Sequence, residues 1–218
     1  MIFAPLVWTT MADRFEILSV RAADGGARLL VQVQSTVAGE VSRETLTVLT
    51  ARAGRVPQKG VIDADALVFL RREHALCAAL ATALRSLAAG GGSRVQLRQK
   101  LCHKGVARDV AKECVGILDE KGYLDEQRGA LAAAENGVRK LWGDRRILAD
   151  LRAKGYGEAA LCAAQTLLSE RDGAARCAQL LRKRGFDGGN PEKLIAALMR
   201  YGYTRTEIRT ALREVMEE

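Results

Sequence analysis

Residues 97–106 read LRQKLCHKGV, residues 147–156 read ILADLRAKGY, and residues 194–203 read LIAALMRYGY. In each stretch an apolar residue is followed by a leucine four positions later, a glycine four positions after that, and then another apolar residue. A spacing of four places both apolar side chains on one face of a helix. The glycine suits the left-handed conformation that ends many helices, and the apolar residue after it suits the hydrophobic contact of such a cap. The three stretches therefore predict three short helices of the same design.

The three cap glycines, Gly105, Gly155 and Gly202, lie 50 and 47 residues apart, a spacing typical of three-helix repeats. Further helices are predicted between and after these glycines, at residues 109–120, 127–141, 158–169 and 172–184, and from the Thr204–Glu207 capping box to the end of the chain. We therefore predict a mainly α fold, with tandem three-helix repeats stacked into an elongated curved body.

The residues before the repeats differ in character. Residues 14–20 and 28–33 predict two strands, joined across the Asp24-Gly25-Gly26 turn, and residues 43–53 predict a short helix that Ser42 caps and Gly54 ends. The predicted organisation has five parts: an N-terminal α+β module of β-hairpin and helix at 1–62, a long connecting helix at 63–92, three-helix repeats at 93–142 and 143–189, and a truncated repeat at 190–218.

Helix boundaries carry several local signals. Asp63 predicts the cap of the long helix, Ser93 and Gln96 form a capping box, and Asn190-Pro191 predicts an N-cap followed by proline in the first turn. Gly90-Gly91-Gly92 predicts a local joint after the long helix. It lacks the lysine and the preceding strand of a phosphate-binding loop.

Composition limits the class of protein. The 218 residues are 48% hydrophobic and 28% charged, as in an ordinary globular chain, and the low aromatic content of 5% favours helices. Five scattered cysteines without a CxxC pair predict reduced thiols in the cytoplasm, and two histidines are too few to suggest a zinc site. The apolar start at residues 1–8 lacks the basic region of a signal peptide, and no stretch is long enough for a membrane span. No cofactor and no metal are predicted.

The net charge of +8 favours a polyanionic partner, and nearly all of the excess lies on the helical body. The candidate contacts are basic residues beside the repeat helices: Arg94, Arg98, Lys104, Arg145, Arg146, Arg152, Lys154, Arg182, Lys183 and Arg184. Each alone is explained as well by a solvated helix face or by the helix dipole. As a group, the cluster of the second repeat predicts a stripe that binds a phosphate backbone or an acidic groove.

Catalytic patterns are missing from the sequence. Asp125 and Glu126 form an acidic pair, but no histidine, nucleophile or metal set accompanies them, and capping of the next helix explains them. Trp142 could stack on a base or anchor a partner, although a single tryptophan at a helix junction is more often packed in the core. We therefore predict that the protein is not an enzyme.

Three motifs together resemble the RecX family. They are Arg146-Ile147-x-x-x-Leu151-x-x-Lys154-Gly155-Tyr156, the similar Leu97-x-x-x-Leu101-x-x-Lys104-Gly105-Val106, and Leu118-x-x-x-Gly122-Tyr123-Leu124-Asp125 between them. Leu181-Arg182-Lys183-Arg184 and Tyr201-Gly202-Tyr203-x-x-x-x-Ile208 also fit, so that the resemblance covers about residues 76–218. The family often has a double aspartate followed by Phe-Ala, whereas this chain has Asp125-Glu126 and then Gly129-Ala130.

The resemblance implies a cytoplasmic, monomeric regulator of the RecA recombinase, built of three-helix repeats. Members of the family bind in the groove of the RecA filament on single-stranded DNA, and some also contact DNA directly. Binding suppresses filament extension, ATP turnover, strand exchange and RecA-assisted cleavage of the LexA repressor. Whether this chain inhibits or assists the recombinase stays open at this point.

A second hypothesis comes from another class of protein, because three-helix units can contain a helix-turn-helix. A DNA-binding transcription regulator of this kind would bind duplex DNA tightly without RecA. The sequence disfavours it, since no single short helix concentrates the arginine, asparagine and glutamine residues that read bases.

Overall fold

The computed structural model describes residues 13–55, 58–89, 92–184 and 190–217. It divides into two compact units, one comprising Met1–Thr82 with Val106–Cys114 and the other Ala83–Gly105 with Val115–Glu218. The apolar start at 1–8 and Gly90 and Gly91 of the predicted glycine joint lie outside the described residues. So do Pro57, where the sequence predicts a loop, and residues 185–189, where it predicts the end of the preceding helix. The five-part domain organisation expected from the sequence stays a prediction.

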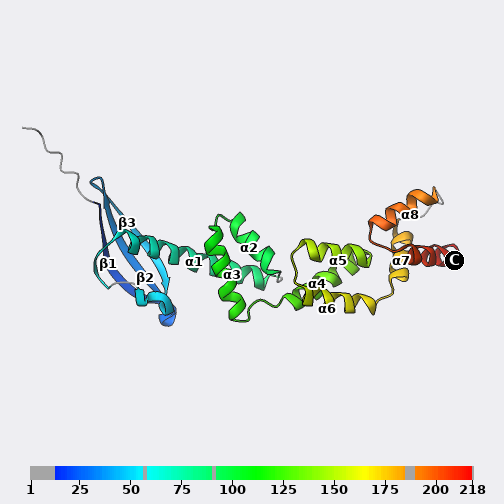
Figure 1. The fold of residues 1–218 in the computed structure, drawn as a ribbon, viewed down its shortest axis with the longest axis horizontal. Coiled ribbons are helices and arrows are strands. Elements are labelled where there is room, and N and C mark those ends of the chain that lie inside the picture. The colour runs from blue at the N-terminus through cyan, green and yellow to red at the C-terminus, as the bar shows by residue number, and fades with distance from the viewer. Residues whose placement is uncertain (1–12, 56–57, 90–91, 185–189, 218) are drawn as a thin grey trace, which may run out of the picture. The chain divides into compact units, whose positions relative to one another are not determined.

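The first unit contains a four-stranded antiparallel sheet, drawn in blue to cyan in Figure 1. Its strands are β1 (Arg14–Ala23), β2 (Arg28–Val37), β3 (Glu40–Leu49) and β4 (Gly60–Ile62), in the order β3-β2-β1-β4. The predicted hairpin is confirmed: β1 pairs with β2, and the single 3-10 turn η1 (Asp24–Gly26) joins them.

The helix predicted at residues 43–53 is wrong. Residues up to Leu49 form strand β3, and a short 3-10 helix, η2 (Thr50–Arg55), follows. Ala38 and Gly39 both have positive φ, +50° and +85°, which makes the tight turn that pairs β3 with β2. Leu46 and Val48 are buried in alternation, so the period of the apolar residues is that of a strand.

One face of the sheet packs against helix α1 (Ala64–Ala88). Leu67 and Leu70 of this helix share a buried cluster with sheet residues Ile17, Val31, Val33, Leu46, Val48 and Ile62. The predicted cap is confirmed, because the Ala66 amide donates a 2.7 Å hydrogen bond to the Asp63 carboxylate. The sheet is therefore anchored by the first turns of the long helix.

The second unit is helical, and its helices lie where the sequence predicts them (Figure 1). The first helices of the predicted repeats are α2 (Arg94–His103), α5 (Asp144–Ala153) and α8 (Pro191–Arg200), each of ten residues. The others are α3 (Arg108–Glu120), whose first half belongs to the first unit, α4 (Glu126–Arg139), α6 (Glu158–Ser169), α7 (Gly173–Arg184) and α9 (Arg205–Met216). Helix α4 packs on α6, and α7 packs on α9.

The predicted helix caps are confirmed. Gly105, Gly155 and Gly202 have φ values of +84°, +74° and +96°, in the left-handed region that glycine tolerates best. At Gly155 the cap hydrogen bonds run from the Gly155 amide to the Arg152 carbonyl and from the Tyr156 amide to the Leu151 carbonyl. Ser93 and Thr204 form complete capping boxes, and Asn190 caps α8 with Pro191 in its first turn.

Two buried clusters lie among the described helices α4 to α9 of the second unit. One contains Ile147 and Leu151 of α5 with alanines of α4 and α6, and the other contains Leu198 of α8 with residues of α7 and α9. The predicted core role of Trp142 is confirmed, because its side chain packs against the first of these clusters while remaining partly exposed. Among the described helices, none combines the length and the apolar character needed to cross a membrane.

Candidate partner-binding surface

The start of α2 lies against the end of α5, in a contact that we name the first joint. The Ser93 hydroxyl donates a hydrogen bond to the carbonyl of Lys154, the C-cap residue of α5. Gly155 faces Val95 so closely that a Cβ at Gly155 would lie 2.6 Å from the Val95 Cβ. The glycine is therefore required both by its backbone conformation and by its neighbour.

The start of α5 lies against the end of α8 in the same way, and we name this contact the second joint. The Gly143 amide donates a 2.8 Å hydrogen bond to the carbonyl of Tyr201, the C-cap residue of α8. A Cβ at Gly202 would lie 2.4 Å from the Arg146 amide nitrogen, and one at Gly143 would lie 2.2 Å from the Gly202 carbonyl carbon. Ser93 and Gly143 are N-caps, and Lys154 and Tyr201 are C-caps, so equivalent positions meet at both joints.

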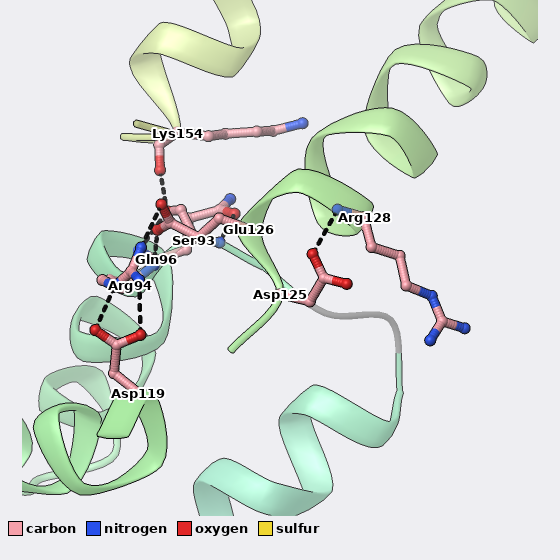
Figure 2. A network of polar contacts seen from close by, with 8 residues as sticks. All are labelled: Ser93, Arg94, Gln96, Asp119, Asp125, Glu126, Arg128 and Lys154. Carbon is pink, nitrogen blue, oxygen red and sulfur yellow. Dashed lines mark hydrogen bonds and ion pairs between the residues drawn. The ribbon is translucent and has the colours of Figure 1, made fainter. Parts of the chain in front are cut away.

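Charges at the first joint are neutralised by carboxylates, as Figure 2 shows. The Arg94 guanidinium lies 2.6 Å from Asp119 and 2.6 Å from Glu126, and the Arg94 amide donates a 2.7 Å hydrogen bond to Glu126. The hydrogen bond from Arg94 lowers the pKa of Asp119. The Lys154 ammonium pairs with Asp150 one turn earlier on α5. Arg94 and Lys154 therefore serve the joint itself.

Charges at the second joint are instead held over aromatic rings. The Arg146 guanidinium carbon lies 4.2 Å from the centre of the Trp142 ring and 5.1 Å from that of Tyr201. Arg184 lies 4.5 Å from the Tyr201 ring centre, and the Lys140 nitrogen lies 5.2 Å from that of Trp142. We name these five residues the cation–aromatic cluster.

The cations of this cluster keep their positive charge available. In the part of the chain that the structure describes, no carboxylate lies within ion-pair distance of Lys140, Arg146 or Arg184. A ring face attracts a cation through its quadrupole without cancelling the charge. Each guanidinium is therefore oriented by the rings, yet it still presents its charge to a partner.

A buried arginine supports the second joint, and the sequence analysis missed it. Arg176 of α7 is 6% exposed, donates a 3.0 Å hydrogen bond to the Trp142 carbonyl and forms an ion pair with Asp144. Burial raises the pKa of Asp144, and the charge of Arg176 opposes this shift. Arg176 lies three residues after buried Gly173 and directly before buried Cys177. Its place on the apolar face of α7 is the one signal that could have identified it.

The ten predicted contact residues fall into three groups. Arg94, Lys154 and Arg182 pair with carboxylates, the last with Glu214 at 3.0 Å. Arg146 and Arg184 lie over aromatic rings. The remaining five are exposed and have no ion-pair partner within the described ranges: Arg98, Lys104, Arg145, Arg152 and Lys183. Their contact with a partner stays a prediction.

The acidic residues and thiols outside these joints have local structural surroundings. Within the described residues, no three or more His, Cys, Asp or Glu side chains gather so that they could hold a metal ion. Asp125 accepts a 2.8 Å hydrogen bond from the Arg128 amide, which is the N-cap role that the sequence predicts for it (Figure 2). Burial raises the pKa of the Cys114 thiol to about 11 and that of the Cys177 thiol to about 12, so both are protonated near neutrality.

Several curated proteins are similar to this chain over its helical part. A protein of Xanthomonas axonopodis pv. citri named regulatory protein RecX is 31% identical over 131 residues, which cover 58% of this chain and 80% of that protein. A regulatory protein RecX of Thermus thermophilus is 36% identical over 123 residues, which cover 51% of this chain and 85% of that protein. No protein-family model matches the chain.

Two solved structures share the fold. The crystal structure of a regulatory protein RecX superposes with a TM-score of 0.68 at 16% identity, over 94% of this chain and 100% of that one. The RecX structure from Lactobacillus salivarius gives a TM-score of 0.54 at 16% identity, over 66% of this chain and 98% of that one. At these identities the likeness is one of fold.

Proposed function

This chain belongs to the RecX family of regulatory proteins, and we propose that it regulates the recombinase RecA without catalysing a reaction of its own. In this proposal it binds the RecA filament on single-stranded DNA as a monomer in the cytoplasm, without a cofactor. Binding inhibits ATP hydrolysis, strand exchange and RecA-promoted LexA cleavage, and so restrains recombination, repair and the SOS response.

The observation that carries the proposal is the uncompensated charge at the second joint. Arg146 and Arg184 are oriented by rings rather than neutralised by carboxylates. Arg145 and Arg152 are exposed on α5 and lie seven residues apart, on one face of that helix. Pre-oriented guanidinium groups suit phosphates and carboxylates, because little side-chain freedom remains to be lost on binding. This surface suits an anionic filament groove.

The repeated joints support a second element of the proposal, that the helices act as stacked units. The units are α2–α4, α5–α7 and the shorter α8–α9, and at both joints the N-cap residue of one first helix donates a hydrogen bond to the C-cap carbonyl of the next. A body with contacts at fixed intervals can touch successive protomers of a filament. If it binds one filament geometry better than another, it shifts the filament towards that state.

The test is RecA-dependent ATP hydrolysis and strand exchange on single-stranded DNA, measured with increasing amounts of this protein. We expect inhibition at about stoichiometric protein, and at least about tenfold more R145E/R152E protein for the same effect, because two cations are reversed. The matched control is R108E/K112E on α3, which makes the same change of charge at two exposed residues of the first unit that take part in neither joint. Unchanged or increased ATP hydrolysis with the wild-type protein would overturn the proposal.

The same protein samples can distinguish a RecA regulator from a transcription regulator that recognises duplex DNA. The RecA regulator binds filaments in preference to bare duplex, whereas a transcription regulator binds a duplex sequence tightly in the absence of RecA. A gel shift with single-stranded and duplex DNA, with and without RecA, distinguishes the two.

A further inference from the structure

An open groove runs between α8 and α9 and is lined mostly by apolar side chains. It encloses about 490 Å³, and Ile195, Ala196, Met199, Ile208 and Leu212 line it. Ile208 is 1% exposed, whereas Met199 is 38% exposed. The groove therefore has a packed floor and an apolar side chain open to solvent, an arrangement that suits a protein contact.

The second repeat shows that this apolar lining is not required for folding. Helices α5 and α6 precede α8 and α9 by 47 residues throughout, so Met199 corresponds to Arg152 and Leu212 corresponds to Gln165. Arg152 and Gln165 are both exposed. The equivalent face of the second repeat is thus also open to solvent, but it carries polar side chains.

Cations border the groove on one side. Arg205, Arg209 and Arg213 are spaced by four along α9, so they form one row, and all three are exposed. The first two line the groove. No carboxylate lies within ion-pair distance of these arginines in the described ranges. At the positions equivalent to Arg205 and Arg209, the second repeat has Glu158 and Cys162, so the second repeat lacks this row.

We propose that this groove docks an acidic amphipathic helix of a protein partner. Apolar side chains at helical spacing would enter the groove, and carboxylates along one flank would pair with the row of arginines on α9. Glu192 also lines the groove, so the residue of the partner that faces it is neutral or basic. The site shares no residue with the cation–aromatic cluster and goes beyond the function proposed above.

Nucleic acid suits this groove less well than a helix does. Single strands bind through base stacking on aromatic side chains and through phosphate contacts. The groove is lined by aliphatic, methionine and charged side chains, with no aromatic ring. A phosphate backbone would satisfy the arginines while leaving Met199 and Ile195 uncovered. The apolar lining and the cationic border together therefore favour an acidic helix over nucleic acid as the partner that binds in the groove.

The test uses the full chain and a fluorescent peptide about four helical turns long, with leucines at helical spacing and glutamates along one flank. We expect fluorescence anisotropy to show saturable binding, weakened at least about tenfold when lysines replace the glutamates. M199R/L212Q, which installs the residues of the second repeat, should weaken binding about tenfold or more. M216Q is the matched control, since Met216 is an exposed methionine outside the groove.

Charge reversal gives a second test on exposed residues that do not support the core. R205E/R209E should lose its affinity for the glutamate peptide and gain affinity for the lysine peptide. Equal affinity for both peptides, no binding of the glutamate peptide, or unchanged binding by M199R/L212Q would overturn the inference. So would a labelled oligothymidylate that binds this groove and loses affinity in R205E/R209E and M199R/L212Q alike. The RecA assays test the proposed function independently of these results.

Discussion

At the first and second joints an N-cap residue donates a hydrogen bond to a C-cap carbonyl, from the Ser93 hydroxyl in one and the Gly143 amide in the other, and the two joints differ in their charges. At both, a helix start meets the glycine cap of the following repeat, through Ser93 and Lys154 in one and Gly143 and Tyr201 in the other. Carboxylates surround Arg94 at the first joint, whereas rings hold Arg146 at the second. The difference teaches that the joint depends on glycine and close backbone approach. Its surface charges can therefore differ without loss of the contact.

The largest expected effect tests the backbone contact. G202A introduces a Cβ that would lie 2.4 Å from the Arg146 amide nitrogen at a residue with φ of +96°. We expect it to lower the free energy of unfolding by at least about 3 kcal/mol, because left-handed strain and overpacking add. G105A is the matched control: Gly105 has a similar φ, but nothing lies within 4 Å of the added Cβ. It should cost only about 1–2 kcal/mol. Equal losses in urea denaturation would contradict the role of the joint.

A smaller effect is expected from the charges beneath each joint. R176M removes the buried partner of Asp144 and should cost about 2 kcal/mol, less than a fully buried pair because Asp144 is partly exposed. R94M removes an exposed cation at the first joint and should cost about 1 kcal/mol. Urea denaturation of both variants measures the comparison, and a costlier R94M would reverse it.

A third prediction concerns the cation–aromatic cluster. W142L keeps an apolar side chain against the core and removes the ring under Lys140 and Arg146. We expect a loss of about 1 kcal/mol in stability. In the RecA assay, about threefold more protein should be needed, because the cations are no longer held in place. Inhibition equal to that of the wild-type protein would show that the rings do not orient the contact.

The smallest expected effect is a difference in response to acid. Arg94 lowers the pKa of Asp119 below its ordinary value of 3.8, so this carboxylate stabilises the fold above that pH. The contribution is lost as pH falls through the lowered pKa. D119N should therefore lose less stability than the wild-type protein between about pH 5 and pH 2.5, in denaturation curves compared at each pH. A wild-type protein with no greater loss than D119N would contradict this account.

The second joint should respond to acid in the opposite sense. Burial raises the pKa of Asp144, so the folded state binds this proton more tightly than the unfolded state does. Protonation of Asp144 on acidification therefore favours folding. Denaturation curves of D119N and D144N over the same pH range therefore measure these two opposite contributions to stability separately.

Local patterns predicted the helical part of the chain well. The cap glycines, the two capping boxes, and the Asp63 and Asn190 caps all follow from residues within a few positions of each other. Strand β3 was missed because Ser42 and Gly54 resemble helix boundary signals. Pairing with β2 provides the backbone hydrogen bonds that decide the matter, and such pairing depends on tertiary context.

The candidate surface could be predicted only in part. The sequence placed basic residues beside the repeat helices, but it could not separate Arg94, bound by two carboxylates, from Arg146, held between two rings. Asp119, Glu126 and Tyr201 are distant in the sequence from the arginines that they contact, whereas Trp142 lies only four residues before Arg146. The groove of α8 and α9 was missed for the same reason, since Met199 and Leu212 look like ordinary helical apolar residues.

The sequence by itself determined the helices and their caps, because hydrophobic spacing and glycine conformation act within a single turn. The same helix and cap signals predicted the mainly helical fold that this chain shares with the solved RecX structures. Only the tertiary structure decided which charges are neutralised, which stay available and which apolar face is left open. Those properties depend on contacts such as Tyr201 with Arg146 and Arg176 with Asp144, which form only when separate helices pack together.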